Sequence, residues 1–260
     1  MSEFREPYEK CGPDCVATPP VLDTADGREH DDCPEVPGLT DSDIILGDYR
    51  DYLPAKDGCW VVTDPPYNVG FSYPEYQDRL QDNDYRDLFA PLAGYRSVII
   101  NYPEVMLGSI VPVLGAPRRM VAWCYNSNLS RQWRMIAWFG CEPQLSLVKQ
   151  PYKNLGDARV MELIKNGSEG CALYDWWQVE MVKNVSAEKR GYVNQIPEEI
   201  ISRILLTTVP PGELVFDPFC GSGTTSAVAR RLGFPSIATD ISEVAISIAL
   251  ERLSELRLFA

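Results

Sequence analysis

One C-terminal segment limits the fold more than any other, because it alternates strand and helix signals around a glycine-rich turn. An apolar run at 213–216 leads to Gly221-Ser222-Gly223, which precedes a predicted helix at 224–233. A second apolar run at 236–239 ends directly before Asp240. Strand, glycine turn, helix and strand in this order are typical of an α/β fold with a parallel sheet.

The glycine turn has the features that a nucleoside-containing cofactor requires. Glycines let the backbone approach a ligand closely, and the first N–H groups of a helix can hold a polar or anionic group. Asp240 follows Gly223 by 17 residues, at the position where an acid in Rossmann-like sites accepts hydrogen bonds from ribose hydroxyls. No Lys follows the glycines, which argues against a P-loop. A helix-capping turn without a ligand is the structural alternative.

Further apolar runs predict strands, and periodic apolar positions predict the helices between them. The expected strands are 43–48, 59–63, 97–100, 120–125, 145–149, 213–216 and 236–239. The expected helices are 84–93, one that begins at Pro103, one after Pro197, 224–233 and 242–257. This alternation implies an α/β fold, with a mostly parallel sheet covered by helices on both faces.

A second motif, Asp64-Pro65-Pro66-Tyr67, comes directly after the predicted strand 59–63. The two prolines fix the backbone and remove two N–H donors, so that carbonyl groups remain as acceptors beside the Asp64 carboxylate. Such acceptors could take the hydrogens of an exocyclic amino group, and Tyr67 offers a flat ring on which a flipped base could stack. A proline-stiffened turn between strand and helix is the alternative for this tetrapeptide.

The acidity of the chain is concentrated at its N-terminus. The 260 residues have a net charge of −13, and residues 1–43 hold 12 acidic and 3 basic side chains. Residues 118–190 hold 11 basic and 7 acidic side chains, so the middle of the chain is locally basic. Binding of phosphates needs a basic face rather than a basic average, and the charge distribution therefore permits a nucleic-acid partner.

Residues 1–43 predict an acidic arm, rich in Pro and Gly and without apolar periodicity. Cys11, Cys15, His30 and Cys33 have a spacing that could hold zinc, but an acidic tail with incidental cysteines is favoured, and no metal is expected. The absence of an apolar leader or a membrane-length run predicts a cytoplasmic protein with no membrane partner.

Both motifs resemble those of the amino-group DNA methyltransferases. Asp64–Tyr67 is similar to the catalytic motif of that family, and Asp217–Thr225 to its S-adenosylmethionine motif. The catalytic motif comes first, as in the circularly permuted β class. Gly47-Asp48 resembles the acidic motif that contacts the adenine of the cofactor, and Asn194-Gln195 resembles the segment beside its methionine moiety. The histidine- and lysine-containing motif that the family usually has before its last helix is absent.

The resemblance implies a Rossmann-like S-adenosylmethionine-dependent methyltransferase fold, with a seven-stranded, mostly parallel sheet and a catalytic domain at 44–260. It implies methyl transfer to N6 of a flipped adenine in double-stranded DNA by direct in-line attack. The implied catalytic residues are Asp64, Pro65, Pro66 and Tyr67. The implied cofactor-binding residues are Asp48, Asp217, Phe219, Gly221, Ser222, Gly223, Thr224, Asp240, Asn194 and Gln195.

Other functions remain open from the sequence. A cytosine-N4 methyltransferase would share nearly every residue, although Asp at position 64 resembles the adenine branch. An RNA or protein methyltransferase, or a non-catalytic DNA-binding protein on the same core, is a further alternative. Cytosine-C5 chemistry is disfavoured, because the chain has no Pro-Cys pair.

Residues 152–192 lie where the resembled family places its target-recognition region. Tyr152, Tyr174, Trp176 and Trp177 are interleaved there with basic side chains, a composition that suits nucleic-acid contacts by stacking and phosphate pairing. Core packing of one of the two tryptophans is the alternative. The shortness of this insertion predicts a short target sequence or help from a second subunit, so a homodimer is expected as one option. The resemblance also permits a restriction endonuclease as a partner, but the sequence does not say whether one exists.

Overall fold

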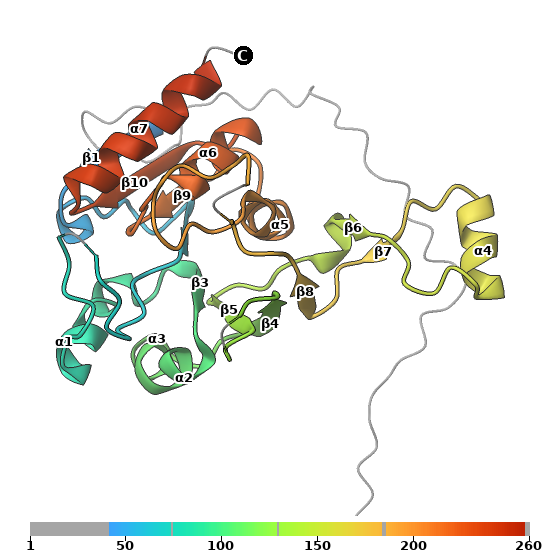
Figure 1. Cartoon of the computed structure of the whole chain (residues 1–260), viewed down its shortest axis with the longest axis horizontal. Coiled ribbons are helices and arrows are strands. Elements are labelled where there is room, and N and C mark those ends of the chain that lie inside the picture. Colours follow the sequence, from blue (N-terminus) through green and yellow to red (C-terminus); the bar gives the residue numbers. More distant parts are fainter. Residues whose placement is uncertain (1–41, 74, 129, 184–185, 258–260) are drawn as a thin grey trace, which may run out of the picture. The chain divides into compact units, whose positions relative to one another are not determined.

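A central sheet of eight strands organises the part of the chain that the structure describes. This computed structural model describes residues 42–257 apart from 74, 129, 184 and 185. The strands are β1 (Ser42–Leu46), β2 (Cys59–Thr63), β3 (Arg96–Asn101), β4 (Arg119–Cys124), β5 (Trp133–Phe139), β8 (Trp176–Gln178), β9 (Leu214–Asp217) and β10 (Ser236–Asp240). Their order across the sheet is β1-β10-β9-β2-β3-β5-β4-β8 (Figure 1). Within this sheet, only β5 runs antiparallel to its neighbours.

Helices cover both faces of this sheet, as the sequence predicts. One layer consists of α1 (Asp82–Asp87), α2 (Pro103–Val105), a π-helical turn (Met106–Ile110) and α3 (Val111–Leu114). The other consists of α5 (Glu198–Thr208), α6 (Thr224–Arg231) and α7 (Glu243–Arg257). Val61 and Ile99 point into a core shared with the first layer, whereas Val62 and Val98 pack against α5 and α6. Continuous burial along β2 explains why its first four residues are apolar rather than alternating.

Three expectations about the strands are wrong. The range 145–149 is predicted to be a strand, but Leu145–Leu147 is a 3-10 turn, because Leu145 and Val148 both pack against the core from an irregular segment. The antiparallel strand β5 is missing from the expected strands, although residues 135–139 form an unbroken apolar run. The sheet has eight strands rather than seven, because β8 from the range 152–192 pairs with the edge of β4.

Residues 149–172, most of which belong to the range 152–192, form an extension that precedes β8 in the chain. A two-stranded hairpin, β6 (Lys149–Gln150) with β7 (Cys171–Ala172), leads to α4 (Ala158–Lys165), which buries none of its residues (Figure 1). The two adjacent tryptophans differ: Trp177 is fully buried in the core, whereas Trp176 is 39% exposed. The alternative that one of them is a packing residue is therefore confirmed. The role of this range in target recognition stays a prediction.

The predicted arm at 1–43 lies outside the described residues except for its last two positions, and so do Cys11, Cys15, His30 and Cys33. Among the residues that are described, no cluster of three or more His, Cys, Asp or Glu side chains could hold a metal ion. Within the same residues, every helix is too short or too polar to cross a membrane.

Candidate active site

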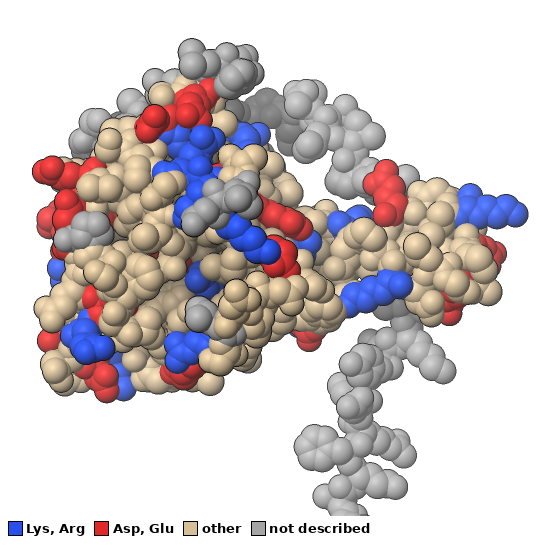
Figure 2. All heavy atoms as spheres, in the orientation of Figure 1, with Lys and Arg blue, Asp and Glu red and all other residues tan. Residues whose placement is uncertain are grey.

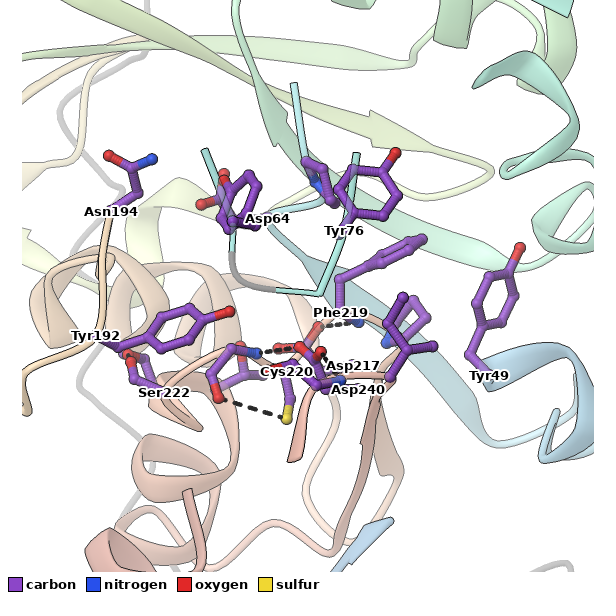
Figure 3. Close-up of a pocket in the computed structure, with 18 of the residues that line it drawn as sticks. Tyr49, Asp64, Tyr76, Tyr192, Asn194, Asp217, Phe219, Cys220, Ser222 and Asp240 are labelled. Carbon is purple, nitrogen blue, oxygen red and sulfur yellow. Dashed lines mark hydrogen bonds between the residues drawn. The ribbon is translucent and has the colours of Figure 1, made fainter. Parts of the chain in front are cut away.

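The two motifs meet at one cavity, at the carboxyl ends of the parallel strands, where open α/β sheets bind their ligands. The cavity has a volume of about 260 Å³. Asp64, Tyr76 and Asn194 face the glycine turn across it (Figure 3). The predicted site residues that line it are Asp48, Asp64, Pro66, Asn194, Gln195, Asp217, Phe219, Gly221, Ser222, Thr224 and Asp240. Pro65, Tyr67 and Gly223 are not in its lining.

Two aspartates shape the glycine turn. Asp217, at the end of β9, accepts hydrogen bonds from Thr63 Oγ1 (2.7 Å) and from the Phe219 N–H (3.2 Å). Burial raises the pKa of Asp217 to about 6. Asp240 accepts from the Gly221 N–H through Oδ2 (2.9 Å) and from the Ser242 N–H through Oδ1 (3.0 Å). The two carboxylates therefore hold the N–H groups of Phe219, Gly221 and Ser242 in place while they face the cavity.

Close packing explains why the turn contains glycine. Gly221 has φ +49°, and a Cβ there would lie 3.0 Å from Cε1 of Tyr192. Tyr192 lines the cavity beside the turn and is one of the residues that the sequence analysis missed. Its proximity to the predicted Asn194 was the only sequence signal for it.

Gly223, the last residue of the turn, packs against Ala249 of α7, and this contact can be tested by substitution. Its φ is +70°, and an added Cβ would lie 2.8 Å from the Ala249 Cβ. We expect Gly223→Ala to lose about 1–2 kcal/mol of unfolding free energy from the left-handed backbone and about 1–3 kcal/mol more from overpacking. Gly212 is the matched control: its φ is +83°, and an added Cβ would have no atom within 4 Å. Urea unfolding should show the larger loss for Gly223→Ala, and equal losses would contradict this packing.

A buried ion-pair network lies beneath the turn. Arg252, 2% exposed on α7, donates to Thr224 Oγ1 (2.8 Å) and to the Ser222 carbonyl (3.3 Å). The same guanidinium pairs with Glu198, which also pairs with Arg231. The network therefore connects the glycine turn to the first turn of α5 and to the end of α6.

Asp64 is the most perturbed carboxyl group of the cavity. Burial raises its pKa to about 7, opposed by the Arg134 guanidinium, whose Nη1 lies 3.8 Å from Asp64 Oδ2. The Tyr67 hydroxyl donates a hydrogen bond to Asp64 Oδ1. The Tyr67 ring is 8% exposed and packs edge-on against Tyr102 at 4.7 Å between centroids. The ring on which a base is predicted to stack is thus covered by protein.

The loop that follows Tyr67 is organised by a further buried carboxylate, Asp78, which the sequence analysis also missed. Asp78, 2% exposed, accepts hydrogen bonds from the N–H groups of Asn68 (2.7 Å), Val69 (3.1 Å) and Phe71 (2.9 Å). The residues between this anchor and the Asp64 motif include three that line the cavity wall, namely Tyr73, Glu75 and Tyr76. None of these positions had a signal beyond their distance from the Asp64 motif.

The charge of the cavity identifies the kind of ligand that it fits. Among the residues that the structure describes, five acidic side chains and a single basic one line it: Asp48, Asp64, Glu75, Asp217, Asp240 and Arg50. The Asp48 carboxylate is held by Arg50, which donates to it from its backbone N–H (3.0 Å) and from Nε (2.8 Å). An acidic lining disfavours phosphorylated nucleotides and suits a ligand of net positive charge, such as a sulfonium compound.

Comparisons with known proteins agree with this fold and site. The structure superposes on PvuII DNA methyltransferase (cytosine-N4-specific) with a TM-score of 0.57 at 15% identity, over 80% of this chain and 85% of that one. For TTHA0409 from Thermus thermophilus, solved in complex with S-adenosyl-L-methionine, the TM-score is 0.50 at 18% identity, over 82% and 94% of the two chains. The fold is therefore that of the Rossmann-like, S-adenosylmethionine-dependent methyltransferases.

Sequence comparison then gives the family. The DNA methylase profile N6_N4_Mtase matches residues 116–251, which is just over half of the chain. This chain belongs to the N6_N4_Mtase family of DNA methylases. It is 26% identical to the type II methyltransferase M.HpaI of Haemophilus parainfluenzae over 216 residues, 74% of this chain and 67% of the relative. It is 29% identical to the DNA adenine methyltransferase YhdJ of Escherichia coli K12 over 231 residues, 77% and 78% of the two chains.

Proposed function

We propose that this chain transfers a methyl group from S-adenosylmethionine to N6 of a flipped adenine in double-stranded DNA. The observation that carries the proposal is that the Asp64 carboxylate and the glycine turn line one acidic cavity. Asp at position 64 favours adenine over cytosine, and YhdJ, a DNA adenine methyltransferase by name, shares 29% identity with the chain. A homodimer and an endonuclease partner remain predictions.

Some residues of the cavity would bind the cofactor, and others would orient the amino group of the target base. Asp240 and the glycine turn would hold the nucleoside part of the cofactor, with the Gly221 and Gly223 N–H groups already paired to Asp240 and to the Cys220 carbonyl, and Asn194 and Gln195 would hold its amino-acid part. When bound, S-adenosylmethionine supplies an electrophilic methyl group on a positively charged sulfur. The Asp64 carboxylate accepts a hydrogen bond from the amino group of the target base. This hydrogen bond orients the amino group and favours the geometry in which the nitrogen lone pair can react.

DNA would reach this cavity along basic and aromatic surfaces. The extension that carries β6, β7 and α4 has several Lys and Arg side chains among a few acidic ones (Figure 2). Lys153 Nζ lies 3.6 Å from the centroid of the exposed Trp176 ring. Basic groups beside exposed aromatic rings suit contacts to phosphates and bases, and we propose that this extension contacts the DNA around the target.

Labelled-methyl transfer to unmethylated genomic DNA tests the proposal. After incubation with labelled S-adenosylmethionine, the DNA is digested to nucleosides, and the modified positions are mapped by sequencing. We expect N6-methyladenine at one short sequence. N4-methylcytosine instead would overturn the adenine assignment, and an absence of label in DNA would overturn the proposed methyl transfer.

The rate of methyl transfer should rise with pH across neutrality. Only the carboxylate form of Asp64 is a pure acceptor, and the pKa of this group is about 7, so the rate should increase through pH 7 and level off above it. Stability should change in the opposite direction: a raised carboxyl pKa contributes stability at low pH that is lost as the pH rises through 7. A rate that is flat from about one pH unit below this pKa to one unit above it would contradict this role.

A further inference from the structure

Arg134 is a buried cation at the catalytic loop that neither motif predicts. It lies on β5, opposite Trp123 of β4 in the sheet register, and is 3% exposed. Four aromatic rings surround its guanidinium, with centroids 5.0–5.9 Å from the central carbon: Tyr67, Tyr102, Trp123 and Tyr125. Its charge faces Asp64 at the wall of the cavity.

This guanidinium keeps hydrogen-bond donors that the described residues do not satisfy. The Tyr125 hydroxyl interacts with it, but Nε and Nη1 of Arg134 have no hydrogen-bond partner in the described part of the chain. The 3.8 Å between Nη1 and Asp64 Oδ2 is an ion pair beyond hydrogen-bond length. A buried donor without an acceptor costs free energy, and a charged one costs more. Such a donor beside a catalytic carboxylate points to an acceptor on the substrate.

The chemistry of the proposed target base supplies that acceptor. The Watson–Crick edge of adenine presents the N6 amino donor next to the N1 acceptor, and enzymes read flipped bases on this edge. An acceptor at Asp64 beside a donor at Arg134 complements this order. Guanine and thymine present a carbonyl next to an N–H group, which reverses the order and places the carbonyl against the carboxylate. Cytosine shares the order of adenine, through N4 and N3.

We propose that Arg134 donates a hydrogen bond to the ring nitrogen beside the reacting amino group, so that Asp64 and Arg134 together read the base edge. The proposal rests on the proposed function. The amino group takes the place of the Tyr67 hydroxyl on the Asp64 carboxylate. Release of Tyr67 uncovers the guanidinium against which its ring packs, and the freed ring becomes a stacking surface for the base.

A chemical double-mutant cycle tests this contact. Duplex oligonucleotides of the sequence mapped in genomic DNA carry either adenine or 1-deazaadenine, which lacks N1, at the target position. For the wild-type chain, we expect the analogue to lower kcat/KM by about 10- to 100-fold, the range for a hydrogen bond to a charged group. Arg134→Met should be slower on adenine and should lose little further activity on the analogue. Arg134→Lys, which keeps the charge, should show an intermediate ratio.

A matched control separates base reading from general electrostatics. Arg131 also packs on the Tyr102 ring, at 4.4 Å, but it is exposed and paired with Glu104 at 2.8 Å. Arg131→Met should keep the wild-type ratio between adenine and 1-deazaadenine. Deletion of N1 alters the ring electronics equally for every variant, so only a changed ratio reports the contact.

The outcomes distinguish this proposal from the function on which it rests. If wild-type chain methylates adenine and Arg134→Met loses the same factor on 1-deazaadenine as wild type does, the contact is overturned. If mapping finds N4-methylcytosine, the same cycle is run with 3-deazacytosine. If Arg134→Met does not fold, as judged by thermal unfolding, the ratio of Arg134→Lys decides: an unchanged ratio overturns the proposal. If wild type methylates no DNA, the proposed function fails first, and this proposal falls with it.

Discussion

Replacement of Asp64 by alanine is expected to reduce methyl transfer to DNA by about 10²- to 10⁴-fold, the range for loss of a positioned group that acts on the reacting atoms. The Asp64 carboxylate is the acidic group of the catalytic motif that lines the cavity, and its pKa of about 7 marks it as desolvated. The loss should appear in kcat rather than in cofactor binding, since the glycine turn does not depend on this side chain.

Two measurements separate this loss from misfolding. Titration calorimetry should give S-adenosylmethionine affinities for Asp64→Ala and wild type within about threefold, a difference close to the scatter found for independent sites. Asp64→Asn keeps one carbonyl acceptor, so it should retain more activity than Asp64→Ala and lose the acid limb of the pH profile. Wild-type rates for Asp64→Ala would exclude the proposed role of this carboxylate.

The sequence predicted those residues of the site that lie close together in the chain and belong to one recognisable motif. Asp217, Gly221 and Asp240 belong to one strand–turn–helix–strand segment, so their proximity follows from its topology. The Asp64 motif follows β2, which pairs with β9, and this pairing brings the motif to the same end of the sheet. Parallel strands share their carboxyl edge, and for this reason the meeting of the two motifs was predictable.

Three buried charged residues that were missed contact parts of the chain to which no sequence motif connects them. Arg134 reaches Asp64 only because β5 inserts antiparallel between β3 and β4, and this pairing of strands has no local sequence signal. Asp78 accepts three backbone N–H groups from residues 7 to 10 positions earlier, a loop geometry without a sequence signature. Arg252 joins helices whose packing depends on the whole fold.

These missed residues share one physical property, which is that each is a charged group with little exposure to solvent. Arg134, Asp78 and Arg252 are 3%, 2% and 2% exposed. Buried charges fix geometry because few arrangements satisfy them. In this site they determine where the Asp64 carboxylate, the loop after Tyr67 and the glycine turn lie.

Substitution of Glu198 by alanine is expected to cost about 3 kcal/mol of unfolding free energy, the lower end of the range for removing one partner of a buried ion pair, because the Glu198 side chain is itself 22% exposed. The carboxylate pairs with Arg252, whose side chain is 1% exposed, and with Arg231. Its removal leaves the Arg252 cation buried beneath Ser222 and Thr224, so S-adenosylmethionine affinity should fall as well. Urea unfolding measures the first effect, and titration calorimetry measures the second.

The neighbouring Glu199 is the matched control for this prediction. It occupies the same first turn of α5 and also pairs with an arginine, Arg203, but its side chain is 57% exposed. Both glutamates interact similarly with the helix dipole, so this contribution cancels in the comparison. Glu199→Ala should cost at most about 1 kcal/mol, the usual limit for a surface pair. Equal losses for the two variants would show that burial of the network does not matter.

The difference in unfolding free energy between wild type and Glu198→Ala should depend on pH, because the ionised Glu198 carboxylate causes it. Hydrogen bonds from Arg231 and Arg252 outweigh burial and lower the pKa of Glu198 below its usual value of 4.5. A lowered carboxyl pKa gives stability that is complete above the unfolded-state pKa and is lost as the pH falls through the folded-state pKa. The difference in unfolding free energy between wild type and Glu198→Ala should therefore be constant near neutrality and shrink in acid.

The double variant Glu198→Met with Arg252→Met should recover much of the stability without the cofactor affinity. An apolar pair can replace a buried ion pair in packing, but it cannot donate a hydrogen bond to Thr224.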